Sequence, residues 1–252
     1  MKRYLLLLLA LPVLSSVLQA DPFRALLFYD TQGYCHDSIP SGIEAIRKLS
    51  KLHRFNLFAT QDARVMNDEG LEKYDVIIFL NTTGNILNEE QQAAVERFVQ
   101  AGKGFVGIHS ATDTEYEWEW YTKMLGHMFY THPEIQSAMV QVEEPDFPGM
   151  DRFAHRFLFT EEWYHFRASL SDELHYLLSV DETSYRPQVR WGSKQTEGMG
   201  FHPVSWCHEF DGGRAFYTAL GHLSATYEDP NFCHHLYGGI YWAATGLGFK
   251  VE

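Results

Sequence analysis

The sequence has little positive charge, which limits the partners that the protein can bind. Its 252 residues include 20 Lys and Arg against 33 Asp and Glu, giving a net charge of −13. Such a surface repels phosphate backbones and anionic lipid head groups. We therefore exclude nucleic acid and anionic membrane surfaces as partners and expect a small, neutral or cationic ligand. The oligomeric state stays open, a homo-oligomer included.

Cysteine is also scarce. The chain has Cys35, Cys207 and Cys233, an odd number without CxxC spacing. This pattern excludes a disulfide framework and a cysteine-based zinc site. One disulfide could form in an oxidising compartment, and the sequence does not select the pair.

Long hydrophobic runs are absent except at the N-terminus. A basic start at residues 1–3 precedes an apolar stretch over 5–14 and a segment rich in small residues over 15–20. This order predicts a secretory signal peptide cleaved after Ala20, and hence a periplasmic or secreted protein. An uncleaved anchor helix is the alternative, although the apolar stretch is short for one. Residues 21–252 show no repeat or linker and are expected to form a single domain.

Predicted strands and helices alternate through the first half of the chain. Strands are expected over 24–29, 55–59, 75–80 and 104–108, with helices from a Ser41 cap to about residue 51 and from an Asn88 cap to about residue 101. This rhythm predicts an α/β fold with a doubly wound, mainly parallel sheet. Ligands of such sheets bind beyond the carboxyl ends of the strands, so His36, Asn81 and His109 should face one crevice.

The pattern changes after residue 128, where short strands dominate. They are expected over 135–143, 174–180, 189–192 and 205–210, with a turn at 211–213 leading into a strand over 214–220. The last segment resembles a hairpin that returns to the sheet. A closing helix is predicted from Pro230 to Thr245, ended by Gly246.

The strand over 104–108 ends in a tight turn that carries His109. Gly107 and Ala111 are small enough for two chain segments to approach closely there. An α/β hydrolase or amidotransferase places Ser or Cys on such an elbow. An imidazole can transfer protons or bind a metal, but it is a poor acyl-transfer nucleophile.

A second histidine, His222, follows the strand over 214–220. In class I amidotransferases, a catalytic His occupies a comparable place, with an acidic residue two positions later. This chain has Ser224 there, so it lacks a Cys-His-Glu triad. It is therefore not expected to be a glutamine amidotransferase.

Carboxylates beside aromatic rings are further candidates for the site. Glu162 precedes Trp163 and Tyr164, and Asp113 and Glu115 precede Trp118. A carboxyl group packed against rings has a raised pKa, which suits a general acid. The alternative is structural: the rings fill the core, and Asp113 or Thr114 caps a helix that runs to about residue 124.

Thirteen His and 15% aromatic residues fit either sugar binding or a large aromatic core. Several of these His lie outside the two strand ends, without the i, i+4 spacing of a helical metal site. A zinc centre built from His therefore remains an open option. These His are His127, His132, His202 and His208.

Several blocks in order along the chain resemble the trehalose-utilisation (ThuA-like) family. They include 107–115, 118–121, 132–133, 162–164, 181–185, 202–208, 213–222 and 238–242. The resemblance implies a flavodoxin-like sheet of the class I amidotransferase-like superfamily, with helices on both faces and a strand-rich insertion. The family residues that it carries over are His36, His109, Glu115, Trp118, His132, Glu162, Trp163, His202, Trp206 and His222. In one departure, this chain has Phe147-Pro148 and Ala154-His155 where relatives often have His-Pro before the block at 162–164.

The resemblance implies a disaccharide or a 3-keto-glycoside as substrate. We expect His109 and His222 to act as a proton-transferring pair or as ligands of one divalent metal, with Glu162 as their acid–base partner. Isomerisation, epimerisation, elimination and metal-dependent hydrolysis fit this set. The other residues carried over would bind the sugar, and the indoles of Trp118, Trp163 and Trp206 would stack on its ring. A non-catalytic carbohydrate-binding protein on the same fold is the alternative.

Overall fold

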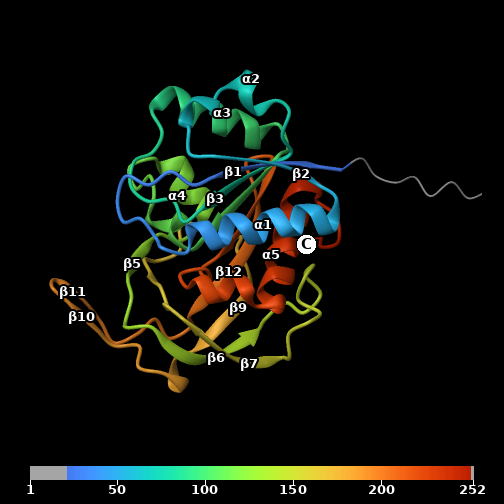
Figure 1. The fold of residues 1–252 in the computed structure, drawn as a ribbon. Coiled ribbons are helices and arrows are strands. Elements are labelled where there is room, and N and C mark those ends of the chain that lie inside the picture. Colours follow the sequence, from blue (N-terminus) through green and yellow to red (C-terminus); the bar gives the residue numbers. More distant parts are fainter. Residues whose placement is uncertain (1–21, 251–252) are drawn as a thin grey trace, which may run out of the picture.

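The structure is a computed structural model that describes residues 22–250. The predicted signal peptide lies outside these residues. A nine-stranded sheet runs through the molecule in the order β2-β1-β3-β4-β13-β12-β9-β6-β7 (Figure 1). Its first five strands are parallel and its last four pair in antiparallel fashion. The predicted α/β class with a mainly parallel core and extra strands is confirmed.

The parallel half contains the strands predicted from the alternating pattern. Their bounds are β1 Arg24–Phe28, β2 Asn56–Thr60, β3 Val76–Leu80, β4 Gly104–Ile108 and β13 Gly213–Thr218. All residues of β3 and β4 are buried, as expected for parallel strands covered on both faces. Because these strands are parallel, the loops that follow them meet at one edge of the sheet.

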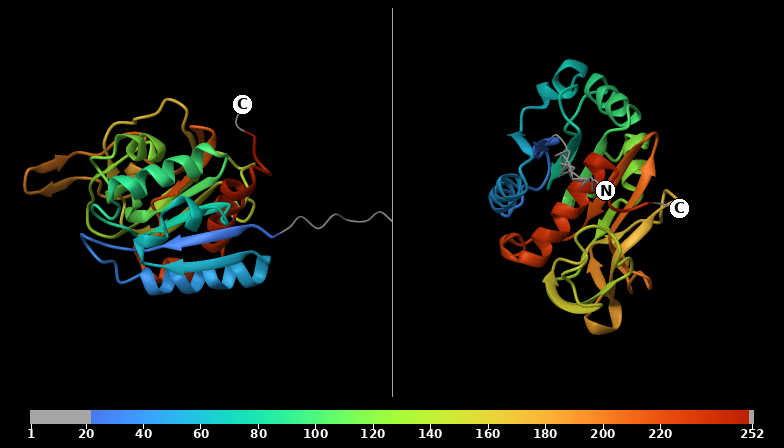
Figure 2. Two further views of the ribbon diagram at one scale, coloured as in Figure 1. Left: turned by 90° about the horizontal axis from the view of Figure 1, so that it is seen from above. Right: turned by 90° about the vertical axis from the view of Figure 1, so that its right-hand side faces the viewer.

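Helices cover both faces of the parallel half (Figure 2). The main helices are α1 Ile39–His53, α3 Glu89–Gln100, α4 Glu119–Leu125 and α5 Pro230–Thr245. A Cβ on Gly104 would meet Ala243 of α5, whereas the neighbouring Phe105 ring packs edge-on against Tyr121 of α4. Since successive residues of a strand point to opposite faces, α4 and α5 lie on opposite sides of the sheet.

Helix ends follow the predicted caps in two cases. Asn88 and Gln91 form a capping box at α3. Helix α5 spans Pro230–Thr245, with the side chain of Asp229 bonded to its first amides and Gly246 in the left-handed conformation.

Two predicted helix starts are wrong. Helix α1 begins at Ile39 rather than after Ser41, because Pro40 occupies its first turn. The segment after Ile108 forms the short 3-10 helix η2, His109–Asp113, and α4 starts only at Glu119. A side-chain carboxylate explains the break, because Glu115 bonds the backbone amides of Ile86 and Leu87 instead of joining a helix.

The antiparallel half holds the strand-rich insertion. Its strands in the sheet are β6 Gln136–Val142, β7 Arg156–Glu161, β9 His175–Asp181 and β12 Pro203–Phe210. Two small ribbons complete it: β5 Phe129–Thr131 with β8 His165–Phe166, and β10 Val189–Trp191 with β11 Lys194–Thr196. The β10–β11 hairpin projects from the body as an arm (Figure 2). Strands β5, β7, β8 and β11 were not predicted. Of these, β5, β8 and β11 have only two or three residues, which carry too little periodicity.

The remaining short helices are α2 Asp68–Leu71, η1 Ala63–Val65, η3 Glu182–Ser184 and η4 Ser224–Glu228. Cys35, Cys207 and Cys233 are free. Within residues 22–250, no helix has both the length and the apolar character needed to cross a bilayer.

Candidate functional site

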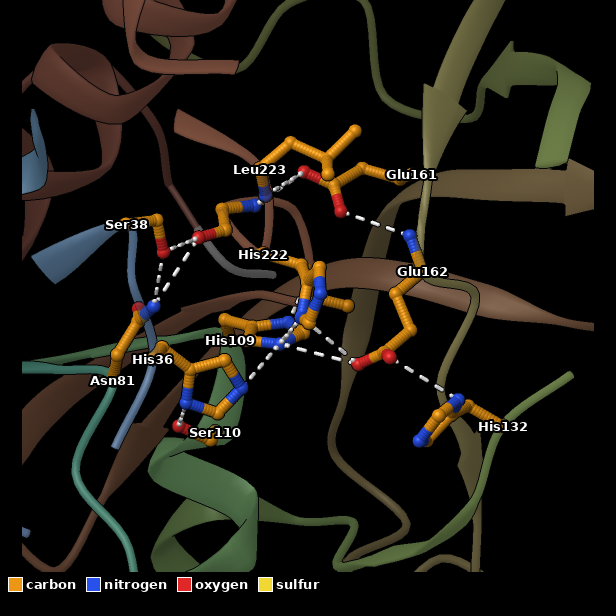
Figure 3. A network of polar contacts seen from close by, with 12 residues as sticks. His36, Ser38, Asn81, His109, Ser110, His132, Glu161, Glu162, His222 and Leu223 are labelled. Atoms are coloured by element: carbon orange, nitrogen blue, oxygen red, sulfur yellow. Dashed lines mark hydrogen bonds and ion pairs between the residues drawn. The ribbon is translucent and has the colours of Figure 1, made fainter. Parts of the chain in front are cut away.

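Four side chains from distant parts of the sequence meet at the carboxyl edge of the parallel strands (Figure 3). His36 lies in the loop between β1 and α1, and His109 begins η2 directly after β4. His222 lies after β13, and Glu162 lies directly after β7. We refer to His36, His109, Glu162 and His222 as the quartet. The quartet combines the strand-end histidines with the carboxylate that the sequence had singled out.

His109 lies at the centre of the quartet and is fully buried. Its φ of 50° is left-handed, a conformation that non-glycine residues rarely adopt outside strained turns and functional sites. A Cβ on Gly107 would lie 3.2 Å from the Cβ of Ala111, so the close approach predicted at this elbow is present. The backbone thus turns sharply and fixes the direction of the imidazole.

The polar atoms of the quartet lie close to one another. His109 Nε2 is 3.1 Å from His36 Nε2, 3.2 Å from His222 Nδ1 and 3.5 Å from Glu162 Oε2. His222 Nδ1 is 3.1 Å from the same Glu162 oxygen. The four atoms all lie within 4.8 Å of one another.

Hydrogen bonds alone do not account for these contacts. His109 Nδ1 lies 2.8 Å from the carbonyl oxygen of Ala219, which only accepts, so Nδ1 carries the proton. On a neutral ring, Nε2 then has a single lone pair, and it faces two imidazole nitrogens and a carboxylate oxygen. At most one of these neighbours can donate well to that lone pair, which leaves other lone pairs directed at one another. A cation between the four atoms would use all of them.

The spacing matches a metal site. Four ligands about 2.05 Å from a zinc ion at the corners of a tetrahedron lie about 3.3 Å apart. Four of the six distances between the quartet atoms are 3.1 to 3.5 Å, and the two others, from His36 to His222 and to Glu162, are no longer than 4.8 Å. Three imidazoles and one carboxylate favour zinc or a similar transition metal over magnesium or calcium, which prefer oxygen ligands.

Protonation of the metal-free quartet follows from burial and from the single carboxylate. Burial, reinforced by the neighbouring imidazoles of His109 and His222, lowers the pKa of His36 to about 2. Burial also works against protonation of His222, but the hydrogen bond and charge of Glu162 outweigh it and raise the pKa of His222. Burial would raise the pKa of Glu162, yet its contacts with the imidazoles of His109 and His222 hold it well below its usual range. Neutral His36 and ionised Glu162 are the forms that bind metals.

The partners behind the quartet fix its orientation. His36 Nδ1 lies 3.3 Å from Ser110 Oγ, and His132 Nδ1 lies 3.1 Å from the second oxygen of Glu162. His109 already bonds a backbone carbonyl. Metal-binding His and carboxylate groups are commonly held by such outer partners.

Glu161 is a supporting residue whose role the sequence did not reveal. Its buried carboxylate accepts from Gly221 N at 2.9 Å, Thr226 Oγ1 at 2.5 Å and the backbone amide of Glu162 at 2.9 Å. It therefore ties the loop of His222 to the segment of Glu162 (Figure 3). Asn81, expected in the crevice, supports the same loop from behind by donating to Gly221 O.

A pocket of about 370 Å³ opens over the quartet. Its volume is within the range of small-molecule sites. Three quartet members reach the pocket wall, whereas His109 lies beneath it. The residues that line it are Tyr34, His36, Asp113, Phe129, His132, Glu162, Tyr164, Trp191 and His222.

The aromatic wall of the pocket differs from the predicted one. The indoles of Trp118, Trp163 and Trp206 are buried and donate to Glu96, Gln136 O and Leu125 O, respectively. They pack in the core, and the pocket is instead lined by the rings of Tyr34, Phe129, Tyr164 and Trp191. Trp191 lies on the β10–β11 arm and is 56% exposed.

Two other predicted binding residues also lie away from the pocket wall. The Glu115 carboxylate is buried and accepts from Gln92 as well as from two backbone amides. His202 is buried between Glu182 and the carbonyl oxygen of Tyr164. Of the predicted binding residues, the structure places His36 and His132 at the pocket.

Comparisons with known proteins agree with this architecture. The sequence model described as trehalose utilisation (ThuA) matches residues 24–243. A ThuA-like protein from Bacteroides uniformis is 24% identical, with a TM-score of 0.73 over 88% of this chain and 91% of that one. A ThuA-like protein from Parabacteroides merdae is 18% identical, with a TM-score of 0.71 over 91% and 92%.

A more distant likeness is to part of a larger enzyme. This chain superposes on the β-galactosidase from Bacillus circulans sp. alkalophilus with a TM-score of 0.55 and 14% identity, covering 87% of this chain and 30% of that one. No functionally curated protein matches the sequence. Because the family match spans most of its length, the chain belongs to the trehalose utilisation (ThuA) family, a carbohydrate-utilisation family on an amidotransferase-like fold.

Proposed function

We propose that this protein is a metal-dependent enzyme that processes a disaccharide or keto-glycoside in the pocket above the quartet. The observation that carries the proposal is the packing of three imidazole nitrogens and one carboxylate oxygen at 3.1 to 3.5 Å, without enough protons to join them. His36, His109, His222 and Glu162 are the proposed ligands of one divalent cation. We also propose that the protein is exported, on the basis of its N-terminal pattern.

A bound divalent cation would supply Lewis-acid chemistry, in which it polarises a carbonyl or hydroxyl oxygen of the sugar. Polarisation of a keto group acidifies the neighbouring C–H bond, which permits isomerisation, epimerisation or elimination of a glycosidic oxygen. Both oxygens of Glu162 are held by imidazoles. We therefore assign Glu162 to the metal rather than to proton transfer.

The walls of the pocket support a sugar as the ligand. Tyr34, Phe129, Tyr164 and Trp191 present rings to the pocket, and the polar groups of Asp113 and His132 lie among them. Aromatic faces stack on the apolar faces of sugar rings, while polar groups bind their hydroxyls. The family match to trehalose utilisation points to the same class of ligand.

A non-catalytic carbohydrate-binding protein is the second candidate. Four protein ligands fill a tetrahedral shell, which is typical of structural rather than catalytic zinc. In that case the metal would stabilise the pocket and perform no chemistry. The two candidates differ in turnover and not in metal content.

The experiment is an incubation of the purified protein with disaccharides and their 3-keto forms, with products identified by NMR. We expect conversion of at least one keto form, loss of conversion after chelation and recovery with zinc, manganese or cobalt. His109→Ala should lose conversion, and His155→Ala, which changes an exposed histidine, should keep it. Sugar binding without conversion under all conditions would favour the binding protein.

A further inference from the structure

The pocket contains a second carboxyl group, Asp113, which the proposed metal centre does not use. Asp113 ends η2, four residues after His109, and lines the same pocket as His132, Glu162 and His222. The two carboxylates differ in how they are held. Glu162 is contacted by imidazoles on both oxygens, whereas the only hydrogen bond to the Asp113 carboxylate among the described residues is one on Oδ1. Asp113 Oδ2 therefore remains available to a ligand.

The contact on Asp113 comes from Tyr116 and extends to a backbone carbonyl. Tyr116 Oη lies 2.7 Å from Asp113 Oδ1 and 2.9 Å from the carbonyl oxygen of Phe129. A phenol has one proton and so can donate to only one of these two acceptors at a time. The hydroxyl therefore sits between a carboxyl that can gain a proton and a carbonyl that cannot.

This arrangement satisfies both protonation states of Asp113. When Asp113 is ionised, Tyr116 donates its proton to Oδ1. When Asp113 is protonated on Oδ2, Tyr116 keeps this bond to Oδ1. When the proton lies on Oδ1, the carboxyl donates to Tyr116 Oη, and the phenol donates to Phe129 O. Only the phenol proton rotates between these patterns, and no heavy atom has to move. A purely structural carboxylate would need only the first pattern.

We propose that Asp113 is the catalytic acid–base residue of this pocket and that Tyr116 is its positioning residue. The inference rests on the proposed function, because it assigns the proton transfer of the same reaction. With a 3-keto-glycoside, Asp113 Oδ2 takes the proton from C2, and the C2–H electron pair forms the C2–C3 double bond of an enolate. The negative charge moves to the C3 oxygen.

The reaction is then completed by elimination. An electron pair of the enolate oxygen re-forms the C3 carbonyl, and the electron pair of the C2–C3 double bond forms a C1–C2 double bond as the C1–O bond breaks. The glycosidic oxygen leaves with the bonding pair and takes the proton back from Asp113. The products are an unsaturated keto sugar and the free alcohol, and no oxidant or other co-reactant is needed.

The surroundings of Asp113 are compatible with this role. Burial raises its pKa, while the hydrogen bond from Tyr116 and the charges of Lys194, His109 and His132 oppose the rise. Four titratable or charged residues therefore face Asp113. His109 lies in η2 and Tyr116 in the loop after it, His132 follows β5, and Lys194 lies in β11. A carboxyl that titrates above its usual range exchanges protons more readily near neutral pH.

The test compares Asp113→Asn with Asp146→Asn, which changes an exposed aspartate outside the pocket. We expect Asp113→Asn to lower kcat about 10²- to 10⁴-fold, the range for loss of a general acid–base group. Metal content and KM should change less than threefold. Asp146→Asn should match the wild type. A kcat within threefold of wild type for Asp113→Asn would overturn the proposal.

Tyr116→Phe separates positioning from general damage to the fold. Without the phenol, ionised Asp113 loses its donor, so its pKa should rise and the acidic limb of the pH–kcat profile should move to higher pH. An unchanged profile would contradict the positioning role of Tyr116.

One further readout needs no turnover. The side-chain ¹³C carboxyl signal of Asp113 should titrate at higher pH than that of Asp146, and at still higher pH in Tyr116→Phe. If no sugar is converted but the carboxyl signals titrate in this order, the proposed reaction is wrong, while the assignment of Asp113 and Tyr116 as a proton-exchanging pair is supported. If Asp113 titrates like Asp146, the proton site itself is wrong.

Discussion

Two groups of His and Glu side chains lie within the described residues, and they differ in what satisfies their polar atoms. The quartet atoms contact mainly one another. The second group comprises His165, Glu182 and His202, which also lie close together. Here backbone groups provide most partners: Glu182 accepts from the amides of Met199 and Gly200, and His202 Nε2 donates to Tyr164 O.

Within the second group, Glu182 and His202 form a structural pair beside the pocket wall. His202 Nδ1 lies 2.9 Å from Glu182 Oε1. Although burial would raise the pKa of Glu182, the hydrogen bonds from His202 and from two amides lower it to about 2. This pair ties the segment after the β10–β11 arm to the sheet. The comparison teaches that residue type alone does not distinguish a structural group from a proposed metal site, and that the partners of the polar atoms separate the two.

The largest expected difference between the two groups is in metal affinity. His109→Ala should weaken zinc binding by on the order of 100-fold or more, because loss of an inner ligand exceeds the 10- to 100-fold effect of an outer partner. His202→Ala should bind zinc within about threefold of wild type. Isothermal titration against a competing chelator measures both. Equal weakening in the two variants would place the ion at the second group.

The free energy of unfolding, unlike the metal affinity, should depend on the second group. Glu182→Gln should lower the free energy of unfolding by about 2 kcal/mol, because it removes the charge that faces His202 in a largely buried pair. The change should be visible in urea denaturation with metal content unaltered. Glu197→Gln, in an exposed pair with Arg190, is the matched control and should stay within about 0.5 kcal/mol. Similar losses of unfolding free energy in the two variants would show that the second group has no special structural role.

A supporting residue of the quartet should have a smaller effect. Glu161→Gln replaces one accepting oxygen by an NH₂ group, so the side chain can no longer accept from Gly221 and Thr226 on one side and from the amide of Glu162 on the other. The loop of His222 should loosen, and zinc affinity should fall about tenfold. Exposed Glu134→Gln serves as the control. Unchanged affinity in Glu161→Gln would show that the His222 loop is held by other contacts.

The smallest expected effect concerns His165, whose two ring nitrogens lack protein partners. Burial lowers its pKa from 6.5 to about 4. The unfolded chain therefore takes up a proton below about pH 6.5 before the folded protein does, so stability is lost as the pH falls from 6.5 to 4. His165→Phe should flatten this dependence and change stability at pH 7 by less than about 1 kcal/mol. An unchanged slope in urea denaturation across this range would assign the titration to another group.

Much of the fold follows from local pattern. The closing helix matches its predicted bounds, because Asp229, Pro230 and Gly246 are each a local signal. The buried apolar runs of β3 and β4 are equally clear. The predicted cap at Ser41 is wrong because Pro40 is a competing start signal one residue earlier. The helix expected after Thr114 is absent, and there the Glu115 carboxylate makes non-local contacts with the amides of Ile86 and Leu87.

The sequence predicted only those site residues whose position follows from the order of the strands in the sheet. His36, His109 and His222 each follow a parallel strand, so the expected sheet order brings them to one edge. Asp113 and Tyr116 are only three residues apart, but their place at the pocket, like that of Trp191 on the arm, depends on other segments, such as the one that supplies Phe129 O. Aromatic residues carried no signal that separates core from pocket, which explains the misplaced indoles.

Anomalous X-ray scattering at the zinc edge, from crystals of protein grown or soaked with zinc, tests the central claim most directly. We expect one strong peak about 2 Å from His36 Nε2, His109 Nε2, His222 Nδ1 and Glu162 Oε2. The absence of a peak there, or a peak beside Glu182 and His202 instead, would contradict the account.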